Sequence, residues 1–473
     1  MLLIIILNIA IKPIWLIMEN MVQNEIGHEQ FGLYAALFSF GLMFLVLSDV
    51  GINQYLTKEL ASKPNFLKSV LPSVFGFKLL VSFVYPNFMV FAGYLLGYRG
   101  EELVYLFIIC IIQAILQIIL FYRAKFQASQ DFKLDSLASV FDKTILIGIT
   151  FFLLSVKIDL DGFIMARGIS SAVAFFVLGF IIIRKYGWFG LSFKKPDLNI
   201  ILRGSFPFAL IALVFSVHER VDQVMLERLA DDKTAGLYAA SYRWVDACMM
   251  YLWTILPLFF ARFSFLHREP EEQQKIFNMG MIISNVPIMF ICGFVFFYGD
   301  QLFWLFSNST SEEIGIMSSG VKILFLAVFF HGFFAIAGTY LSSCGYVNFI
   351  NKMMVVSIII NIVLNVILID SLGSLAAAIS TVVSTAYLSI AYVVYIRWHT
   401  PLKISGKIVG MLFFNAMIFM GVLYVLNMFI ETWYVNMIIG LIVLVGMSFL
   451  TGLLKLSGIL DKNKSIVKTP VEA

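Results

Sequence analysis

The chain contains the stretch Leu103 to Tyr122, LVYLFIICIIQAILQIILFY, in which no residue carries a formal charge. As a helix, this stretch is long enough to cross the hydrocarbon core of a bilayer, which is roughly 30 Å thick. Similar apolar runs recur along the 473 residues, which are 60% hydrophobic and 13% charged, with a mean hydropathy of +0.93. Soluble globular proteins do not have this composition. The sequence therefore predicts an all-α polytopic membrane protein.

The apolar runs predict about 14 transmembrane helices. The first run lacks a basic leader and a small-residue cleavage site before Glu19, so we interpret it as a span and not as a signal peptide. The predicted spans are 1–18, 31–50, 70–96, 103–122, 137–156, 162–183, 205–226, 235–260, 279–298, 320–341, 353–370, 373–396, 408–430 and 433–454.

The charges of the connecting loops predict the orientation of the chain, because cytoplasmic loops are enriched in Lys and Arg. Alternate connections carry most of the basic residues: Lys58, Lys63, Lys68, Arg123, Lys125, Lys133, Arg184, Lys185, Lys194, Lys195, Arg203, Arg262, Arg268, Lys275, Lys352, Arg397, Lys403, Lys407, Lys455, Lys462, Lys464 and Lys468. The opposite connections hold only Arg99, Lys157, Arg228 and Lys233. We therefore expect a multi-pass membrane protein with both termini in the cytoplasm.

An internal repeat divides the chain into two halves. The sequence MVQNEIGHEQFGLYAA, from Met21 to Ala36, aligns without gaps with MLERLADDKTAGLYAA, from Met225 to Ala240, and both copies lie at the same place in the topology. This arrangement predicts two six-helix lobes, related as a parallel pseudo-repeat, plus two C-terminal helices. The expected boundaries are an N-terminal lobe at 1–184, a cytoplasmic linker at 185–204, a C-terminal lobe at 205–398, two extra spans at 399–456 and a cytoplasmic tail at 457–473.

Two segments carry a family resemblance. The segment NEIGHEQFGLYAALFSFGLMFLVLSDVGINQYLTKEL, from Asn24 to Leu60, resembles the opening of the polysaccharide (O-antigen type) flippases of the multidrug/oligosaccharidyl-lipid/polysaccharide exporter superfamily. The segment RVDQVMLERLADDKTAGLYAASYR, from Arg220 to Arg243, resembles the seventh span of that family and the start of the eighth. The positions that match the family motif are Gly32, Tyr34, Asp49, Gly51, Gln54, Asp222, Gly236 and Tyr238.

The resemblance implies both a function and a cargo. It implies two lobes around a central cavity in the bacterial inner (cytoplasmic) membrane. It also implies a flippase that moves an undecaprenyl-pyrophosphate-linked oligosaccharide repeat unit to the outer face of that membrane by alternating access. The product would be O-antigen of lipopolysaccharide or another surface polysaccharide. The partners it implies are the lipid-linked glycan, membrane lipids and the polysaccharide polymerase machinery.

Charged residues inside the predicted spans are the candidates for binding, because a charge in the membrane is costly and usually faces the bundle interior or a water-filled cavity. A pyrophosphate group is anionic, and Lys or Arg can neutralise it. The candidate cations for the cargo are Lys78, Arg220, Arg243 and Lys322. The alternative is that these charges pair with carboxylates within the bundle; for Lys78 the sequence shows no nearby partner and leaves both readings open.

Acidic and histidine side chains are candidates for ion coupling, with H⁺ or Na⁺ as the coupled ion and no other cofactor. These residues are His218, Glu219, Asp222, Asp246 and His331. The alternative for each is a hydrogen bond between helices. The pairs Gln113 with Gln117 and Asn361 with Asn365 have the i,i+4 spacing that also suits hydrogen bonds between helices, although contact with sugar hydroxyls is equally consistent.

Other functional classes find little support. We find no Walker loop, no His-Glu-x-x-His motif and no Cys/His spacing for a metal, and the four cysteines lie in or beside apolar segments. The nearest enzymatic alternative, a membrane polymerase or ligase of lipid-linked glycans, would be expected to have a large outer loop, whereas the longest predicted outer connection is 299–319. An ion-coupled multidrug extruder of the same superfamily is the other alternative. Nucleic acid is not an expected partner.

Overall fold

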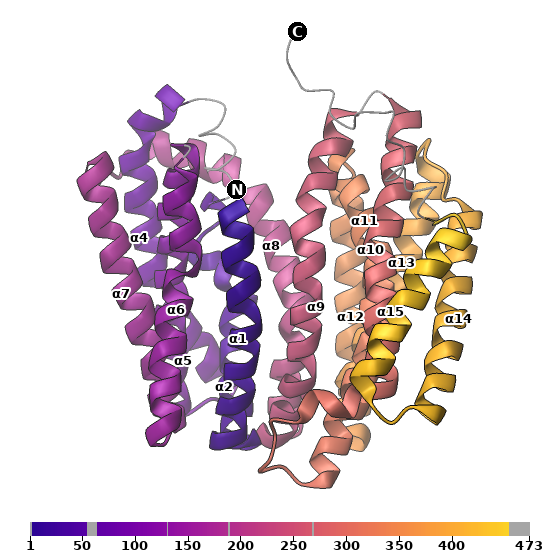
Figure 1. The fold of residues 1–473 in the computed structure, drawn as a ribbon. Helices are drawn as coiled ribbons and strands as arrows, with labels where there is room; N and C mark the ends of the chain where they lie inside the picture. Colours follow the sequence, from indigo (N-terminus) through magenta and orange to yellow (C-terminus); the bar gives the residue numbers. More distant parts are fainter. Residues whose placement is uncertain (1, 54–63, 130, 188–189, 267–268, 454–473) are drawn as a thin grey trace. The chain divides into compact units, whose positions relative to one another are not determined.

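A computed structural model describes residues 2–53, 64–129, 131–187, 190–266 and 269–453 of the chain (Figure 1). These ranges contain no β-strand and two 3₁₀ turns, η1 (Leu45–Ser48) and η2 (Gly299–Phe303). The α-helices are α1 (Leu2–Ile26), α2 (His28–Met43), α4 (Pro64–Leu95), α5 (Glu101–Ala128), α6 (Phe132–Val156), α7 (Leu160–Tyr186), α8 (Lys195–Leu229), α9 (Asp232–Phe265), α10 (Pro270–Tyr298), α11 (Ser311–Ser343), α12 (Val347–Leu372), α13 (Ser374–His399), α14 (Gly406–Phe429) and α15 (Trp433–Leu450).

Each of the 14 predicted spans overlaps one α-helix in the described ranges, so the predicted fold class is confirmed; the span predicted at 31–50 is wrong at its end, because α2 stops at Met43 and η1 follows. Eleven of these helices are long and apolar enough to cross a membrane, judged by length and composition over the described residues. Several extend well past the predicted spans, as α8 does toward Lys195. The following predicted positions lie outside the described residues: Gln54, Lys58, Lys63, Arg268, Lys455, Lys462, Lys464, Lys468 and the tail 457–473.

Local sequence signals explain where helices begin. The side chain of Asp131 accepts a hydrogen bond from the backbone N–H of Leu134 and caps the start of α6, and Asp159 caps α7 in the same way. Pro270 is the first residue of α10, a position where its missing N–H costs no hydrogen bond. The helices are therefore set by polar caps at their ends and by apolar runs between them.

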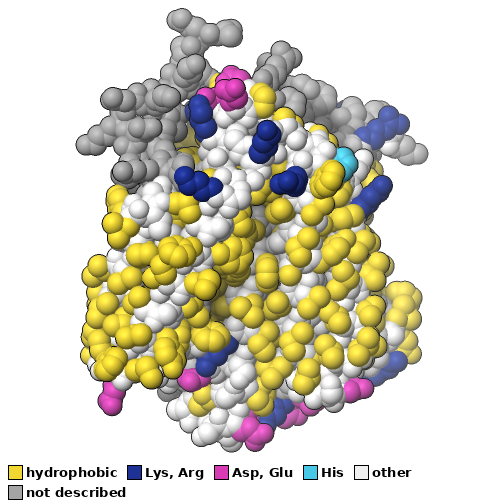
Figure 2. All heavy atoms as spheres, turned by 90° about the vertical axis from the view of Figure 1, so that its right-hand side faces the viewer, with side chains coloured by type: hydrophobic (Ala, Val, Ile, Leu, Met, Phe, Trp, Pro, Cys, Tyr) yellow, Lys and Arg dark blue, Asp and Glu magenta, His cyan; other side chains and the backbone are white. Residues whose placement is uncertain are grey.

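The surface is apolar where a soluble protein would be polar. Large hydrophobic side chains such as Phe83 and Phe429 are 75% and 82% exposed. On the face drawn in Figure 2, hydrophobic side chains form a broad band between two ends at which charged side chains gather. Because lipid tails can solvate such a band and water cannot, the chain is a multi-pass membrane protein.

The described chain forms two compact units. Unit 1 comprises 1–240, 305–313 and 365–377, and unit 2 comprises 241–304, 314–364 and 378–473. Within unit 1, α4 packs on α5, α1 on α6, α5 on α7 and α2 on α8; within unit 2, α10 packs on α14, which also packs on α15. The boundaries of the predicted lobes, and the cavity between them, stay predictions.

Candidate functional site

The chain turns sharply after α2, at the family-motif positions Asp49 and Gly51. After α2, the chain passes through η1 and then through two residues with left-handed backbone conformation, Val50 (φ 52°) and Gly51 (φ 73°). Glycine adopts this conformation freely, whereas a β-branched residue such as Val50 does so only under strain. The requirement for a left-handed turn explains the glycine of the Asp49-x-Gly51 motif.

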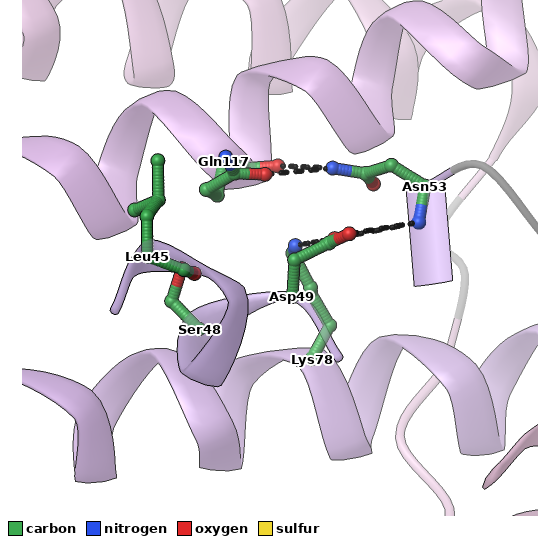
Figure 3. A network of polar contacts seen from close by, with 6 residues as sticks. All are labelled: Leu45, Ser48, Asp49, Asn53, Lys78 and Gln117. Carbon is green, nitrogen blue, oxygen red and sulfur yellow. Dashed lines mark hydrogen bonds and ion pairs between the residues drawn. The ribbon is translucent and has the colours of Figure 1, made fainter. Parts of the chain in front are cut away.

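A buried polar network holds this turn (Figure 3). Lys78 of α4, whose side chain is 0% exposed, donates to Asp49 Oδ1 and forms an ion pair with that carboxylate. The Asp49 carboxylate also accepts from the backbone N–H of Asn53 at 3.3 Å. Asn53 Nδ2 in turn donates to Gln117 Oε1 of α5 at 2.9 Å. The network thus connects the end of α2 with α4 and α5, all within unit 1.

This pairing changes what Lys78 can offer to a ligand. A lone ammonium group buried in a membrane protein carries a large desolvation penalty, and a carboxylate in contact with it offsets much of that penalty. Because Asp49 supplies the opposite charge, the pair presents little net charge to an anion. Of the two readings that the sequence left open for Lys78, the structure favours pairing within the bundle.

A second buried network surrounds Asp222 of α8. Tyr238 of α9 donates to Asp222 Oδ2 at 3.1 Å, and Asn365 Nδ2 of α12 donates to Asp222 Oδ1 at 2.6 Å. Asp222 is only 4% exposed. Two family-motif positions, Asp222 and Tyr238, are therefore in direct contact. The sequence left open whether Asn361 and Asn365 make hydrogen bonds between helices or contact sugar hydroxyls, and Asn365 makes a hydrogen bond between helices.

A third buried polar group is the ion pair of Arg167 and Glu19, which the sequence did not predict. Arg167 of α7 forms an ion pair with Glu19 of α1, and its guanidinium carbon lies 4.9 to 5.3 Å from the ring centres of four aromatic residues, Trp15, Tyr34, Phe38 and Phe163. Such contacts stabilise a buried cation through the negative face of each ring. The family-motif position Tyr34 is thus one wall of the pocket that holds Arg167. Glu19 was not among the predicted site residues, because its partner lies far away in the sequence.

The other candidate cations divide between the two units. Arg220 belongs to unit 1 and is half-buried, whereas Arg243, which is 8% exposed, belongs to unit 2. Lys322 in unit 2 forms an ion pair with Asp300 at 3.3 Å. It also lines an otherwise apolar cavity of about 190 Å³ between α10, α11 and α14, whose walls include Phe296. Binding of cargo by these cations stays a prediction.

The candidates for ion coupling are similarly distributed. His218 is 8% exposed and lies one turn before Asp222 on α8, next to the half-buried Glu219. Asp246 is half-buried on α9. The ring of His331 lies 4.0 Å from that of Phe334, measured between centres. Over the residues that the structure describes, no group of three or more His, Cys, Asp or Glu side chains is arranged to hold a metal ion.

Comparison with models of protein families assigns the chain to a family. The model of a family described as polysaccharide biosynthesis protein matches residues 1–266, more than half of the chain. The chain belongs to this family. A second model, described as MatE, matches residues 267–367. The family recognised from the two sequence segments is thereby confirmed, and the chain is a membrane transporter of the multidrug/oligosaccharidyl-lipid/polysaccharide exporter type.

Solved structures show the same fold. The chain is similar to the lipid II flippase MurJ in an inward closed conformation, with a TM-score of 0.78 and 15% identity over 96% of this chain and 99% of that chain. It is also similar to an inward-facing multidrug resistance MATE family transporter, with a TM-score of 0.68 and 14% identity over 82% of this chain and 94% of that chain. A third structure, of a MOP superfamily transporter from Pyrococcus furiosus, gives a TM-score of 0.60 and 14% identity over 83% and 92% of the two chains. Curated proteins yield no match to the sequence.

Proposed function

We propose that this protein flips an undecaprenyl-pyrophosphate-linked oligosaccharide from the cytoplasmic to the outer face of the bacterial inner membrane, for O-antigen or another surface polysaccharide. The observation that carries the proposal is the match of 1–266 to the polysaccharide biosynthesis family. The similarity of nearly the whole chain to the fold of a lipid II flippase supports it. The basic connections support an orientation with both termini in the cytoplasm.

Arg220 of unit 1 and Arg243 of unit 2 are separate candidates that we propose for contact with the pyrophosphate. A guanidinium group has five donors in a planar fork, so it can bind a phosphate in bidentate fashion while still bonded to a neighbouring group. Lys78 and Lys322 each have a carboxylate partner, Asp49 and Asp300, which lowers the net positive charge they present. A paired lysine attracts an anion less strongly than an unpaired lysine would, so we assign these two lysines a minor role in cargo binding.

Coupling to H⁺ or Na⁺ is proposed for the Asp222 network. Its carboxylate lies inside the helical bundle and accepts hydrogen bonds from two neutral donors, Tyr238 and Asn365, on two other helices. Binding of a proton or a cation at this carboxylate would change its hydrogen bonds to Tyr238 on α9 and Asn365 on α12. His218, Glu219, Asp246 and His331 remain further candidates for the same role.

The experiment that tests the proposed function is deletion of the gene in its host. We expect lipid-linked oligosaccharide to accumulate on the cytoplasmic face, out of reach of a membrane-impermeant lectin, and surface polymer to be lost. Arg243→Ala, expressed at the normal level, should fail to restore the polymer, while Arg243→Lys should restore it in part because it keeps the charge and loses the bidentate geometry. Unchanged surface polymer in the deletion strain would rule the proposal out.

Drug export is the second candidate function, since the MatE model matches 267–367 and MATE transporters share the fold. In that case the deletion strain would become sensitive to cationic drugs and keep its surface polymer. The same strain therefore separates the two functions.

A further inference from the structure

The two copies of the internal repeat pack against each other through their glycines. Gly32 is the fifth residue of α2, and Gly236 is the fifth residue of α9. A Cβ atom on Gly32 would lie 1.7 Å from the carbonyl oxygen of Asp232, and one on Gly236 would lie 1.9 Å from the carbonyl oxygen of His28. Both distances are far below van der Waals contact. Only glycine at both positions allows the backbones of the two helices to approach this closely.

The contact is reciprocal. His28 and Asp232 are the first residues of α2 and α9 and occupy equivalent positions in the two copies of the repeat, as Gly32 and Gly236 do. Each glycine thus meets the carbonyl of the first residue of the other helix, which is the pattern of a contact around a two-fold axis. Four residues after each glycine, Ala36 and Ala240 are both 0% exposed. Gly-x-x-x-Ala on both helices is the pattern of small residues that close helix crossings in membranes require.

A short segment covers the start of α2. Residues 305–313, which we call the strap, follow η2 and end with the first three residues of α11. In the strap, the backbone N–H of Asn308 donates to Asn24 Oδ1 at 2.9 Å, and Asn308 Nδ2 donates to the carbonyl oxygen of Asn24 at 3.0 Å. The hydroxyl of Ser309 lies 2.8 Å from His28 Nε2. The ring of Phe306, which is 1% exposed, stacks on that of His28 with centres 5.6 Å apart.

The strap belongs to unit 1, although the chain on both sides of it belongs to unit 2. Its last residue, Glu313, forms an ion pair at 2.6 Å with Lys233 in the first turn of α9. The strap therefore makes contacts near the starts of both helices of the glycine contact. It contacts Asn24 at the end of α1 and His28 at the start of α2, and it contacts Lys233 at the start of α9. We call the glycine contact and the strap together the clasp.

We propose that the clasp is the outer gate of the transporter: release of cargo at the outer face requires the strap to leave Asn24 and His28 and the starts of α2 and α9 to separate. The proposal rests on the proposed flippase function and on the predicted orientation, which puts the end of α1 and the starts of α2 and α9 at the outer face. Nothing other than glycine fits the closed crossing, and the bonds of the strap are short contacts between side chains and backbone that can break and form again without unfolding a helix.

A disulfide across the clasp tests the proposal. Asn24→Cys and Asn308→Cys are combined in a chain whose native cysteines are replaced by Ala, and the membranes are oxidised with copper phenanthroline. We expect the disulfide to form in most molecules, to lower appearance of glycan at the outer face at least tenfold, and to release that block when it is reduced. The matched control joins Asn415→Cys with Thr451→Cys; in the native protein Asn415 Nδ2 of α14 donates at 3.0 Å to the hydroxyl of Thr451, which directly follows α15. That control disulfide should leave transport unchanged.

A second variant tests the glycine contact without any transport assay. Gly32→Ala puts a methyl group where the carbonyl of Asp232 lies, so the closed crossing cannot form and disulfide formation between positions 24 and 308 should slow at least tenfold. The matched control is Gly148→Ala in α6, where an added Cβ meets nothing within 4 Å. Equal rates for the two variants would overturn the proposal, as would normal transport by fully cross-linked protein or failure of positions 24 and 308 to cross-link. Because cross-linking needs no cargo, it tests the clasp even if the glycan is not the cargo, which the deletion strain tests separately.

Discussion

The buried pair of Lys78 and Asp49 can be tested with a double-mutant cycle. The variants are Lys78→Met, Asp49→Asn and the combination of both. Methionine has nearly the length of lysine without its charge, and asparagine keeps an oxygen that can accept the hydrogen bond from the backbone of Asn53. The cycle therefore removes the charges while it preserves most of the packing and the turn at the end of α2.

The expected magnitudes follow from the burial of each partner. Removal of one member of a buried ion pair costs about 3–5 kcal/mol, because the other charge is left without compensation. The ammonium group of Lys78 is 0% exposed, so Asp49→Asn should fall near about 5 kcal/mol. The side chain of Asp49 keeps 13% exposure and some hydration, so Lys78→Met should fall near about 3 kcal/mol. Since replacement of both charges is often close to neutral, the double variant should lose less than either single variant.

The assay is unfolding of purified protein in detergent micelles, followed by transport for every variant that remains folded. We expect the double variant to be more stable than both single variants and to transport cargo. If the two single losses simply add in the double variant, the pair is not coupled and the reasoning is refuted. If the double variant is stable but inactive, Lys78 contacts the cargo directly and the structural role argued above is wrong.

Two further predictions concern the other buried networks. Arg167→Met leaves Glu19 without its cation and should destabilise the protein by about 3 kcal/mol in the same assay, whereas an unchanged unfolding midpoint would show that the pair contributes nothing. Tyr238→Phe removes one hydrogen bond to Asp222 and should cost about 0.6–1.7 kcal/mol, and Asp222→Ala should cost more because it removes the acceptor for both Tyr238 and Asn365; equal losses would contradict the network.

The positions of the helices could be predicted from the sequence because the membrane leaves few choices. A segment in lipid must satisfy its backbone hydrogen bonds internally, so each apolar run of sufficient length becomes a helix. The repeat also predicted an equivalence correctly, since Gly32 and Gly236 are each the fifth residue of the matching helices α2 and α9. The contact between the two copies of the repeat was not predictable, because similarity between two segments does not reveal that they touch.

The partners of the buried charges could not be predicted for the same reason. Sequence spacing reveals neighbours three or four residues apart on one helix. Lys78 and Asp49 lie on different elements, and Arg167 and Glu19 lie on α7 and α1. Asp222 has His218 at the i,i+4 position, yet Tyr238 and Asn365, which donate to its carboxylate, lie on α9 and α12. The break of α2 after Met43 was also missed, because the apolar run continues through η1 without a change in composition.

The central claim is that the protein moves a lipid-linked glycan across a bilayer. The most direct test reconstitutes the purified full-length protein into liposomes that carry a lipid-linked oligosaccharide on the inner leaflet alone, and measures capture by a lectin added outside. Our account predicts that the captured fraction rises with time in liposomes that contain the protein, and much more slowly with Arg220→Ala or without protein. Capture that stays at the protein-free level under every ion gradient applied would contradict the assignment as a flippase.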